Sequence, residues 1–405
     1  MNYDIHKIRS YFPILENKVY DKPFVYFDSG ASAQKPVQVL EAEEELHNKY
    51  YGNIHRGAHF MADKATEQFE NVRNKVKDLI NAKNREEIIF TKGTTESINL
   101  VAFSFCEQFV KEGDEIIVSE MEHHANIVPW QLAAIRKKAR IVKLPFSDKG
   151  EILLDKLPEL INNKTKLIAI AHVSNVLGTI NPISEITKIA RQNNVVVLVD
   201  GAQAVQHLNV DVQETDVDFY TFSAHKMYGP NGVGVLYGKR KWLEQMPPYQ
   251  GGGEMISEVS FEGTTFNEIP YKFEAGTPNI TSVIAFGAAI DFLNKIGLPN
   301  IKEWENDLLH YATKKLKEIP GLKIYGESNS KSSVISFNIE NVHAYDLGML
   351  LDKMGIAVRT GHLCADTVMQ HYNMQGCLRI SFGAYNTKEE IDIFLKALKK
   401  VLLML

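Results

Sequence analysis

Short apolar runs alternate with amphipathic stretches between about residues 87 and 237, and this alternation restricts the possible fold most. The run VVVLVD, at 195–200, is apolar at nearly every position, as expected for a strand covered on both faces. Amphipathic stretches separate such runs, which is typical of a mostly parallel sheet between layers of helices. The expected strands are 87–90, 115–119, 140–144, 166–172, 195–200, 219–223 and 234–237, and the expected helices are 95–110, 127–138 and 183–193. The sequence therefore predicts an α/β domain.

The last third of the chain has a different pattern. We expect helices at 282–295, 302–318 and 344–353, strands at 333–339 and 378–382, and a final helix after these. That helix begins with Thr387-Lys-Glu-Glu390, a capping box. This pattern predicts a smaller α+β domain. We divide the chain into an N-terminal segment (1–20) packing on the small domain, a large α/β domain (21–285) and the small C-terminal domain (286–405).

Composition and charge argue against several classes of partner. The net charge is −5 with both signs well mixed, whereas nucleic acid or an anionic membrane requires clustered Lys and Arg. The start of the chain, MNYDIHKIRSYF, lacks the apolar core of a signal peptide, and no apolar run approaches a membrane span. The three cysteines, Cys106, Cys364 and Cys377, do not suggest a disulfide framework. We expect a cytoplasmic protein.

Two charged residues fall at the ends of strands expected to be neighbours. Asp200 ends VVVLVD, where its carboxylate could pair with a pyridinium nitrogen or simply cap the next turn. Lys226 follows the strand at 219–223 and precedes a glycine-rich turn, and desolvation there would lower its pKa and help it to form an imine. Alone, Lys226 would more commonly be a surface lysine. Both residues at one sheet edge, with Gln203, Ser223 and His225 between them, indicate a pyridoxal 5'-phosphate site, in which Lys226 holds the cofactor as a Schiff base.

Three further features lie at strand ends. Gly93-Thr94-Thr95 precedes a helix, whose free N–H groups and dipole suit a phosphate, although a plain helix cap is the alternative. His123 and His124 do not form H-E-x-x-H, so we expect no metal site, but an imidazole there could stack on a pyridine ring and exchange protons. Asn175 could donate to the phenolic oxygen of the cofactor.

Six segments resemble, in order, the group II cysteine desulfurases of the SufS type: GTTESIN, MEHHANIVPWQ, DGAQAV, FSAHKMYGPNGVGVLYG, QGGGEMI and FEAGTPN. These are class-V aminotransferase-like enzymes of pyridoxal-phosphate fold type I, and the resemblance runs from about residue 20 to the C-terminus. It implies that Lys226 is the Schiff-base lysine, Asp200 the pyridinium partner and His123 the ring-stacking acid/base. It implies cofactor or substrate contacts for Thr95, Asn175, Gln203, Ser223 and His225, and a homodimer in which Thr277 reaches the neighbouring subunit's phosphate.

The C-terminal domain contributes a second group of residues. Cys364 ends Arg359-Thr-Gly-His-Leu-Cys, where positive neighbours favour a reactive thiolate, although a buried structural thiol is the commoner fate of a free cysteine. Arg379 lies in mid-strand and needs an anionic partner, either a substrate carboxylate or an internal Asp or Glu. The resemblance implies that Cys364 is the nucleophile, that Arg379 binds the substrate carboxylate, and that His55 and Arg359 line the substrate side. Cys106 and Cys377 are expected to be structural.

The Cys364 segment departs from the family pattern R-x-G-H-H-C-A-x-P. Leu363 replaces the second histidine, and Thr367 stands where proline is usual. Asp366 adds a negative charge, which should raise the pKa of the Cys364 thiol if the carboxylate lies close to it. These departures concern the subtype and the acceptor rather than the nucleophile.

The expected reaction converts L-cysteine to L-alanine. Sulfane sulfur would pass through a Cys364 persulfide to an acceptor protein, for iron–sulfur cluster assembly. Selenocysteine lyase and cysteine-sulfinate desulfinase activities share this scaffold and are the nearest alternatives. Another class-V transaminase or lyase, with Cys364 incidental, is a second alternative. A non-catalytic binding protein that keeps the fold is the third.

Overall fold

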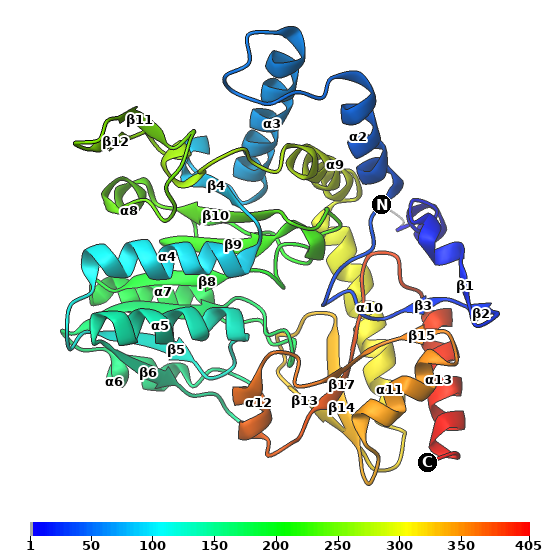
Figure 1. Cartoon of the computed structure of the whole chain (residues 1–405). Helices are drawn as coiled ribbons and strands as arrows, with labels where there is room; N and C mark the ends of the chain where they lie inside the picture. Colours follow the sequence, from blue (N-terminus) through cyan, green and yellow to red (C-terminus); the bar gives the residue numbers. More distant parts are fainter. Residues whose placement is uncertain (1–2) are drawn as a thin grey trace.

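A seven-stranded sheet forms the centre of the larger domain in the computed structural model, which describes residues 3–405 (Figure 1). The strand order is β4-β10-β9-β8-β7-β5-β6, and only β10 runs antiparallel to its neighbours. The strands are β4 (Ile88–Thr91), β5 (Glu115–Ser119), β6 (Arg140–Leu144), β7 (Thr165–Ala171), β8 (Val196–Asp200), β9 (Phe219–Ser223) and β10 (Gly234–Gly238). The predicted α/β class with a mixed, mostly parallel sheet is confirmed.

Apolar cores cover both faces of this sheet, which explains why its strands are apolar almost throughout. Alternate residues of β8 point to opposite sides, so Val197 and Val199 enter one core while Val196 and Leu198 enter the other. The first core contains residues of α3 (Phe60–Leu79), α7 (Ile183–Gln192) and α9 (Ile280–Ile296), and the second contains residues of α4 (Thr94–Phe109) and α5 (Val128–Lys137). Figure 1 shows α4 and α5 in front of the sheet.

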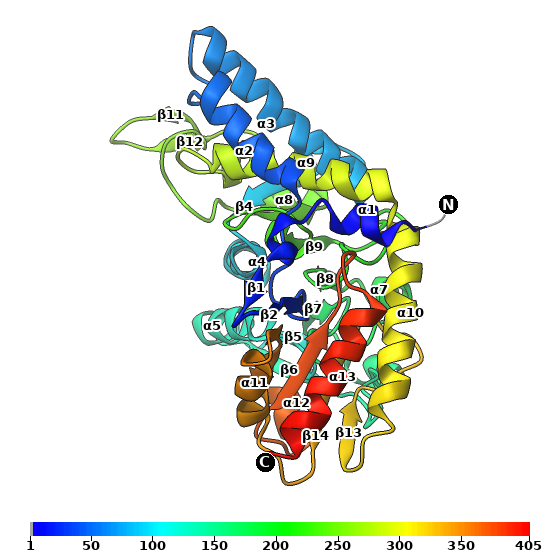
Figure 2. The same cartoon turned by 90° about the vertical axis from the view of Figure 1, so that its right-hand side faces the viewer.

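The smaller domain is built on a four-stranded antiparallel sheet in the order β13-β14-β17-β16. Its strands are β13 (Leu322–Tyr325), β14 (Val334–Ile339), β16 (Arg359–Gly361) and β17 (Cys377–Ser381). Its helices are α10 (Leu298–Leu316), α11 (Ala344–Asp352), α12 (Asp366–His371) and α13 (Lys388–Leu402), of which α10 and α13 lie side by side in Figure 2. The predicted capping box of Thr387 and Glu390 is present at the start of α13.

Two parts of the chain connect the domains. α9 packs on α2 (Val37–Lys49) and α3, whereas α10 packs on α13 and β14, and the two helices meet at Gly297 with a bend of 76°. At the other end of the chain, the Tyr3 hydroxyl donates to the Ala384 carbonyl oxygen at 2.6 Å. β3 (Val25–Tyr26) then pairs with β15 (Ile356–Ala357) of the small domain. The division at residues 20 and 285 stays a prediction.

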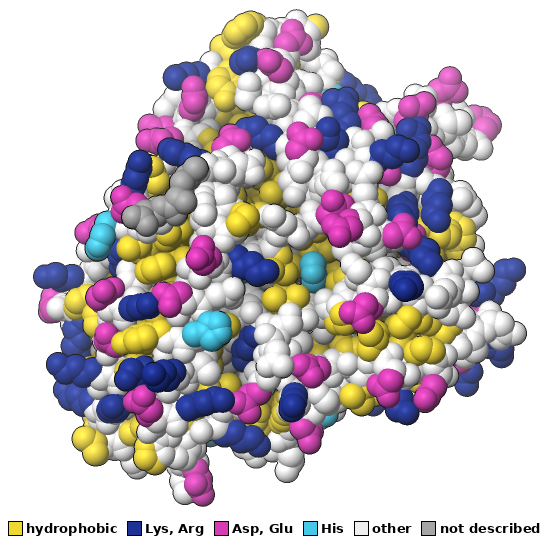
Figure 3. Space-filling view, turned by 180° about the vertical axis from the view of Figure 1, so that it is seen from behind, with side chains coloured by type: hydrophobic (Ala, Val, Ile, Leu, Met, Phe, Trp, Pro, Cys, Tyr) yellow, Lys and Arg dark blue, Asp and Glu magenta, His cyan; other side chains and the backbone are white. Residues whose placement is uncertain are grey.

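Several elements are not foreseen from the sequence pattern. They are the helices α1 (Ile5–Arg9), α2 and α3, the hairpin β1 (Lys18–Val19) with β2 (Lys22–Pro23), and the projecting hairpin β11 (Ile256–Val259) with β12 (Thr264–Phe266). Within residues 3–405 no single helix is long and apolar enough to cross a membrane. The helices α9 and α10, which are bent against each other, pass the same test as a pair, by length and composition only. The face seen in Figure 3 carries acidic and basic side chains interspersed.

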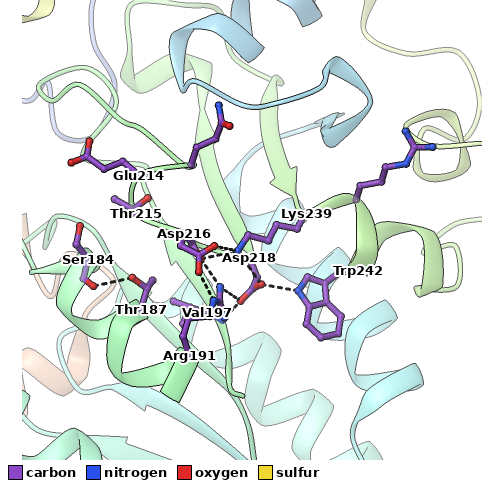
Figure 4. Close-up of polar contacts among 12 residues, drawn as sticks. Ser184, Thr187, Arg191, Val197, Glu214, Thr215, Asp216, Asp218, Lys239 and Trp242 are labelled. Atoms are coloured by element: carbon purple, nitrogen blue, oxygen red, sulfur yellow. Dashed lines mark hydrogen bonds and ion pairs between the residues drawn. The ribbon is translucent and has the colours of Figure 1, made fainter. Parts of the chain in front are cut away.

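A buried carboxylate ties together the end of the sheet where β8 and β9 begin (Figure 4). Asp218, fully buried, accepts hydrogen bonds from the Val197 backbone N–H at 2.9 Å and the Trp242 indole N–H at 2.8 Å. It also accepts from the Arg191 guanidinium at 2.7 Å. Its neighbour Asp216 contacts the same arginine, but its side chain is 51% exposed.

We expect Asp218→Asn to lower the free energy of unfolding by about 2 kcal/mol, because the amide turns an N–H toward groups that are all donors. Asp216→Asn is the matched control and should cost less than about 1 kcal/mol, because solvent screens its ion pair. Denaturant midpoints of the two variants against wild type measure the difference. Equal losses in both variants would contradict the structural role of Asp218.

Candidate active site

A cavity of about 340 Å³ lies between the two domains, at the ends of β8 and β9. The large domain contributes Asp200 and Lys226 to its wall, and the small domain contributes Cys364 and Arg379. The predicted site residues that line this cavity are Thr94, Thr95, His123, Asn175, Asp200, Gln203, Ser223, His225, Lys226, Arg359, Cys364 and Arg379. The structure therefore brings both predicted groups of residues to one place.

Asp200 and Lys226 lie on neighbouring parallel strands, as expected. Asp200 ends β8, and Lys226 is in the single turn that follows β9. Burial raises the pKa of Asp200 and lowers that of Lys226, and each charge partly offsets the shift of the other. The alternative role of Asp200 is partly realised, because its Oδ1 accepts from the Ala202 N–H at 2.9 Å. A buried carboxylate with so few partners suits a cationic ring nitrogen.

The phosphate end of the cavity is the N-terminus of α4. The Thr94 N–H and the Thr94 hydroxyl both lie 2.8 Å from Ser223 Oγ, which joins the helix start to the end of β9. The N-cap residue, Gly93, has no side chain, so the helix dipole and the N–H groups of the first turn beyond Thr94 are available to an anion. Gly234 lets β10 pass close to the start of α4, since a Cβ at this position would lie 2.3 Å from Gly93 Cα.

Two histidines of the cavity are held in the neutral form. Burial, followed by the charge of Lys226, lowers the pKa of both His123 and His225 to about 4. His123 Nδ1 accepts from the Ala125 N–H at 3.0 Å, which leaves the proton of the neutral ring on Nε2. His123 can therefore donate one proton from a defined atom.

Sequence reasoning missed Glu122, which fixes the turn that carries His123. Glu122 is fully buried and accepts from the Asn126 amide at 2.7 Å and the Ala171 N–H at 2.8 Å. The hydroxyl of Ser119 is a further partner, and burial raises the pKa of Glu122 to about 8. The only sequence signal is its place directly before the two histidines.

Arg379 has the internal carboxylate partner that was one of its two predicted alternatives, and the substrate role stays a prediction. Its Nη2 lies 3.2 Å from Asp28 Oδ1, so an internal carboxylate does pair with it. Its Nη1 donates to the Asn175 carbonyl oxygen at 3.0 Å, whereas its buried Nε has no partner among residues 3–405. Asp28 also binds Arg359 at 2.6 Å. Sequence reasoning missed Asp28, which lies some 350 positions away in the chain.

Cys364 occupies the turn between β16 and α12, where its side chain lines the cavity and is also exposed to solvent. The Asp366 carboxylate pairs with His124 at 2.6 Å and with His362. Cys106 and Cys377 are buried, as predicted for structural thiols, and burial raises their pKa values to about 12 and about 11.

Two predicted site residues do not reach the cavity within one chain. His55 Nε2 lies 3.1 Å from Glu70, next to Tyr271, and Thr277 is exposed. Asn175 does line the cavity, but its amide donates to the Leu363 carbonyl oxygen at 2.8 Å. The roles predicted for these three residues stay predictions.

The buried Gln203 Oε1, also without a partner among the described residues, completes a polar cavity whose donor set fits pyridoxal phosphate. A lysine, an aspartate, a neutral histidine and a helix N-terminus all contribute to its wall. Fold and site together define a pyridoxal-phosphate enzyme of fold type I.

Comparison with known proteins narrows this class. The family model for aminotransferase class-V matches residues 25–394. A cysteine desulfurase of Shigella sonnei is 50% identical over 402 residues, which is 99% of each chain. A cysteine desulfurase of Wigglesworthia glossinidia brevipalpis is 49% identical over 403 residues, 99% of this chain and 98% of the other.

Solved structures agree with these relatives. The crystal structure of the cysteine desulfurase CsdA from Escherichia coli superposes with a TM-score of 0.93 at 40% identity, covering 99% of both chains. The cysteine desulfurase of Thermococcus onnurineus gives 0.94 at 37% identity, covering 99% of this chain and 98% of the other. The chain belongs to the aminotransferase class-V family, in the branch of the cysteine desulfurases, and the expected resemblance is confirmed.

Proposed function

We propose that this protein converts L-cysteine to L-alanine and retains the sulfur on Cys364. One observation carries the proposal: Lys226 with Asp200 from the large domain and Cys364 with Arg379 from the small domain line one cavity. The relatives named cysteine desulfurase over nearly the whole length support it.

The cofactor would be held by residues of the large domain. Lys226 would bind it covalently, Asp200 and His123 would contact its ring, and the Thr94–Ser223 pair at the start of α4 would bind its phosphate. When bound, pyridoxal phosphate supplies an electron sink that stabilises negative charge at the substrate Cα.

Residues of this chain account for the remaining steps. Arg379, with Arg359 beside it, would bind the substrate carboxylate as a cationic pair held by Asp28. The amine of Lys226, with its pKa lowered by burial, would remove the Cα proton. His123 Nε2–H can return a proton.

The sulfur step uses the thiolate of Cys364. Its Sγ attacks the substrate sulfur, an S–S bond forms, and the substrate Cβ–S bond breaks. The electron pair of that bond stays with Cβ, which is then protonated to the methyl group of alanine. Cysteine and one thiol therefore give alanine and one persulfide, and no outside oxidant is needed.

The exposure of Cys364 supports delivery to an acceptor, because the thiol borders both the cavity and solvent. We propose an acceptor protein that serves iron–sulfur cluster assembly, and a cytoplasmic location. The positions of His55 and Thr277 outside the cavity of their own chain support a homodimer in which each chain completes the site of its partner.

The test measures alanine and sulfur from L-cysteine, the sulfur as sulfide with a reducing thiol, which reduces the Cys364 persulfide, and as sulfane sulfur without the thiol. We expect alanine and sulfur in equal amounts in each case. Rates on L-selenocysteine and L-cysteine sulfinate, compared with L-cysteine, distinguish the neighbouring lyase and desulfinase activities. Amino transfer to a keto acid without release of sulfur would overturn the proposal in favour of a transaminase.

A further inference from the structure

The turn that carries Cys364 has an unfavourable backbone. Leu363 has φ of 55° and Cys364 has φ of 53°, so two successive non-glycine residues adopt the left-handed region. Side chains with a Cβ rarely adopt this conformation, and it persists where surrounding contacts impose it. The position of the thiol therefore depends on contacts made outside the turn.

Backbone groups of the turn are held by the large domain. The His124 N–H donates to the Cys364 carbonyl oxygen at 2.8 Å, and the Asn175 amide donates to the Leu363 carbonyl oxygen at 2.8 Å. Both partners lie beyond β-strand ends of the large domain, β5 and β7 respectively. The turn thus crosses the boundary between the domains.

A side-chain cluster adds to these contacts. Asp366 Oδ2 lies 2.6 Å from His124 Nε2, and Asp366 Oδ1 contacts His362 Nδ1 on the other side of the cysteine. We call these three residues the Asp366 bridge. It joins the small domain, both before and after Cys364, to the large domain.

Two groups of Asp366 approach the same nitrogen of His124. Its carboxylate Oδ2 lies 2.6 Å from His124 Nε2, and its backbone N–H lies 3.1 Å from that nitrogen. The bridge is charge-assisted, although its side chains are between 38% and 53% exposed.

We propose that Asp366 is a positioning residue for Cys364, and this rests on the proposed function. The Asp366 bridge holds the thiol over the cavity, so it is needed when Cys364 Sγ attacks the substrate sulfur. It contacts none of Lys226, Asp200 or Arg379, so substrate binding and removal of the Cα proton do not depend on it. Asp366 thereby has a positioning role, whereas the sequence suggested only an effect of its charge on the thiol.

Two substrates separate these steps. L-cysteine needs the thiol, because its sulfur leaves only when a nucleophile accepts it. L-cysteine sulfinate needs no such nucleophile, since its oxidised sulfur departs as sulfur dioxide, which water takes up as sulfite, and the electron pair stays with Cβ. A loosened Cys364 turn should slow the first reaction and spare the second.

The experiment compares Asp366→Ala with wild type on both substrates. We expect kcat for L-cysteine to fall about fivefold to tenfold, as suits a partly exposed charged network that positions a nucleophile, while the rate on L-cysteine sulfinate stays within about twofold. Asp366→Glu, which keeps the charge, should recover part of the loss. Asp307→Ala removes an exposed small-domain ion pair with Lys388 and is the matched control, expected at wild-type rates on both substrates.

A double-mutant cycle gives a second readout. His124→Ala should lower the rate on L-cysteine by a similar factor, and the double variant should be no slower than either single one, because one bridge is lost in each case. Equal losses on both substrates, or no loss on L-cysteine, would overturn the positioning role while leaving the proposed function intact. Failure of wild type to form alanine from L-cysteine would overturn both.

Discussion

Lys226→Ala should reduce alanine formation from L-cysteine by at least about 10³-fold. The variant loses the group that binds the cofactor covalently and the amine that removes the Cα proton, and a positioned general base alone contributes about 10²–10⁴-fold. Among residues 3–405 no other amine lines the cavity, because its other cations are the guanidinium groups of Arg359 and Arg379. The absorbance band near ~420 nm, typical of a protonated lysine–cofactor imine, should also be lost.

Lys331→Ala is the matched control for this variant. Lys331 is also a lysine with a pKa lowered by burial, to about 8, but it contacts the Gly326 carbonyl oxygen outside the cavity. Its replacement should leave the band intact and turnover within about twofold. Retention of the band in Lys226→Ala, or its loss in Lys331→Ala, would contradict the cofactor assignment.

Cys364→Ala should abolish the sulfur chemistry but leave cofactor binding unchanged. The band near ~420 nm should remain, because Lys226 and the cofactor pocket lie in the other domain. Alanine formation from L-cysteine should fall at least about 10²-fold, since no other thiol of residues 3–405 lines the cavity and loss of one catalytic group costs of this order. Absorbance and alanine release measure the two effects.

The matched control is Cys106→Ala. Cys106 is buried in α4, and burial raises its pKa to about 12, so it is protonated and shielded from the substrate. This variant should turn over L-cysteine at the wild-type rate. Undiminished turnover in Cys364→Ala would show that the sulfur leaves without this thiol, as in a lyase.

The strands of the large sheet could be predicted because burial on both faces leaves an apolar run in the sequence. Three expected strands, 115–119, 140–144 and 219–223, match the observed bounds of β5, β6 and β9. The helix α2 gave a weak signal, because it buries only Val39 and Leu46, whereas α3 buries Ala62, Ala65, Phe69, Val72 and Val76 at helical spacing and could have been predicted. The hairpin β11–β12 is exposed and so lacks the alternation that marks a half-buried strand.

The site could be predicted where residues follow strands that are neighbours in the sheet. Asp200 and Lys226 are of this kind, since β8 and β9 are consecutive strands of the sheet in the chain and also neighbours in it, whereas the full strand order is not sequential. Asp28 could not be found in this way, because it reaches Arg379 only after β3 joins the small domain. The pairing of Asp366 with His124 likewise depends on how the two domains pack.

The most direct test is the mass of the peptide that contains Cys364 after the enzyme meets L-cysteine without a reductant. We predict an increase of about 32 Da on this peptide, the mass of one added sulfur atom, together with an equimolar amount of alanine. The peptides with Cys106 and Cys377 should be unchanged. Alanine formed while the Cys364 peptide keeps its original mass would contradict the account.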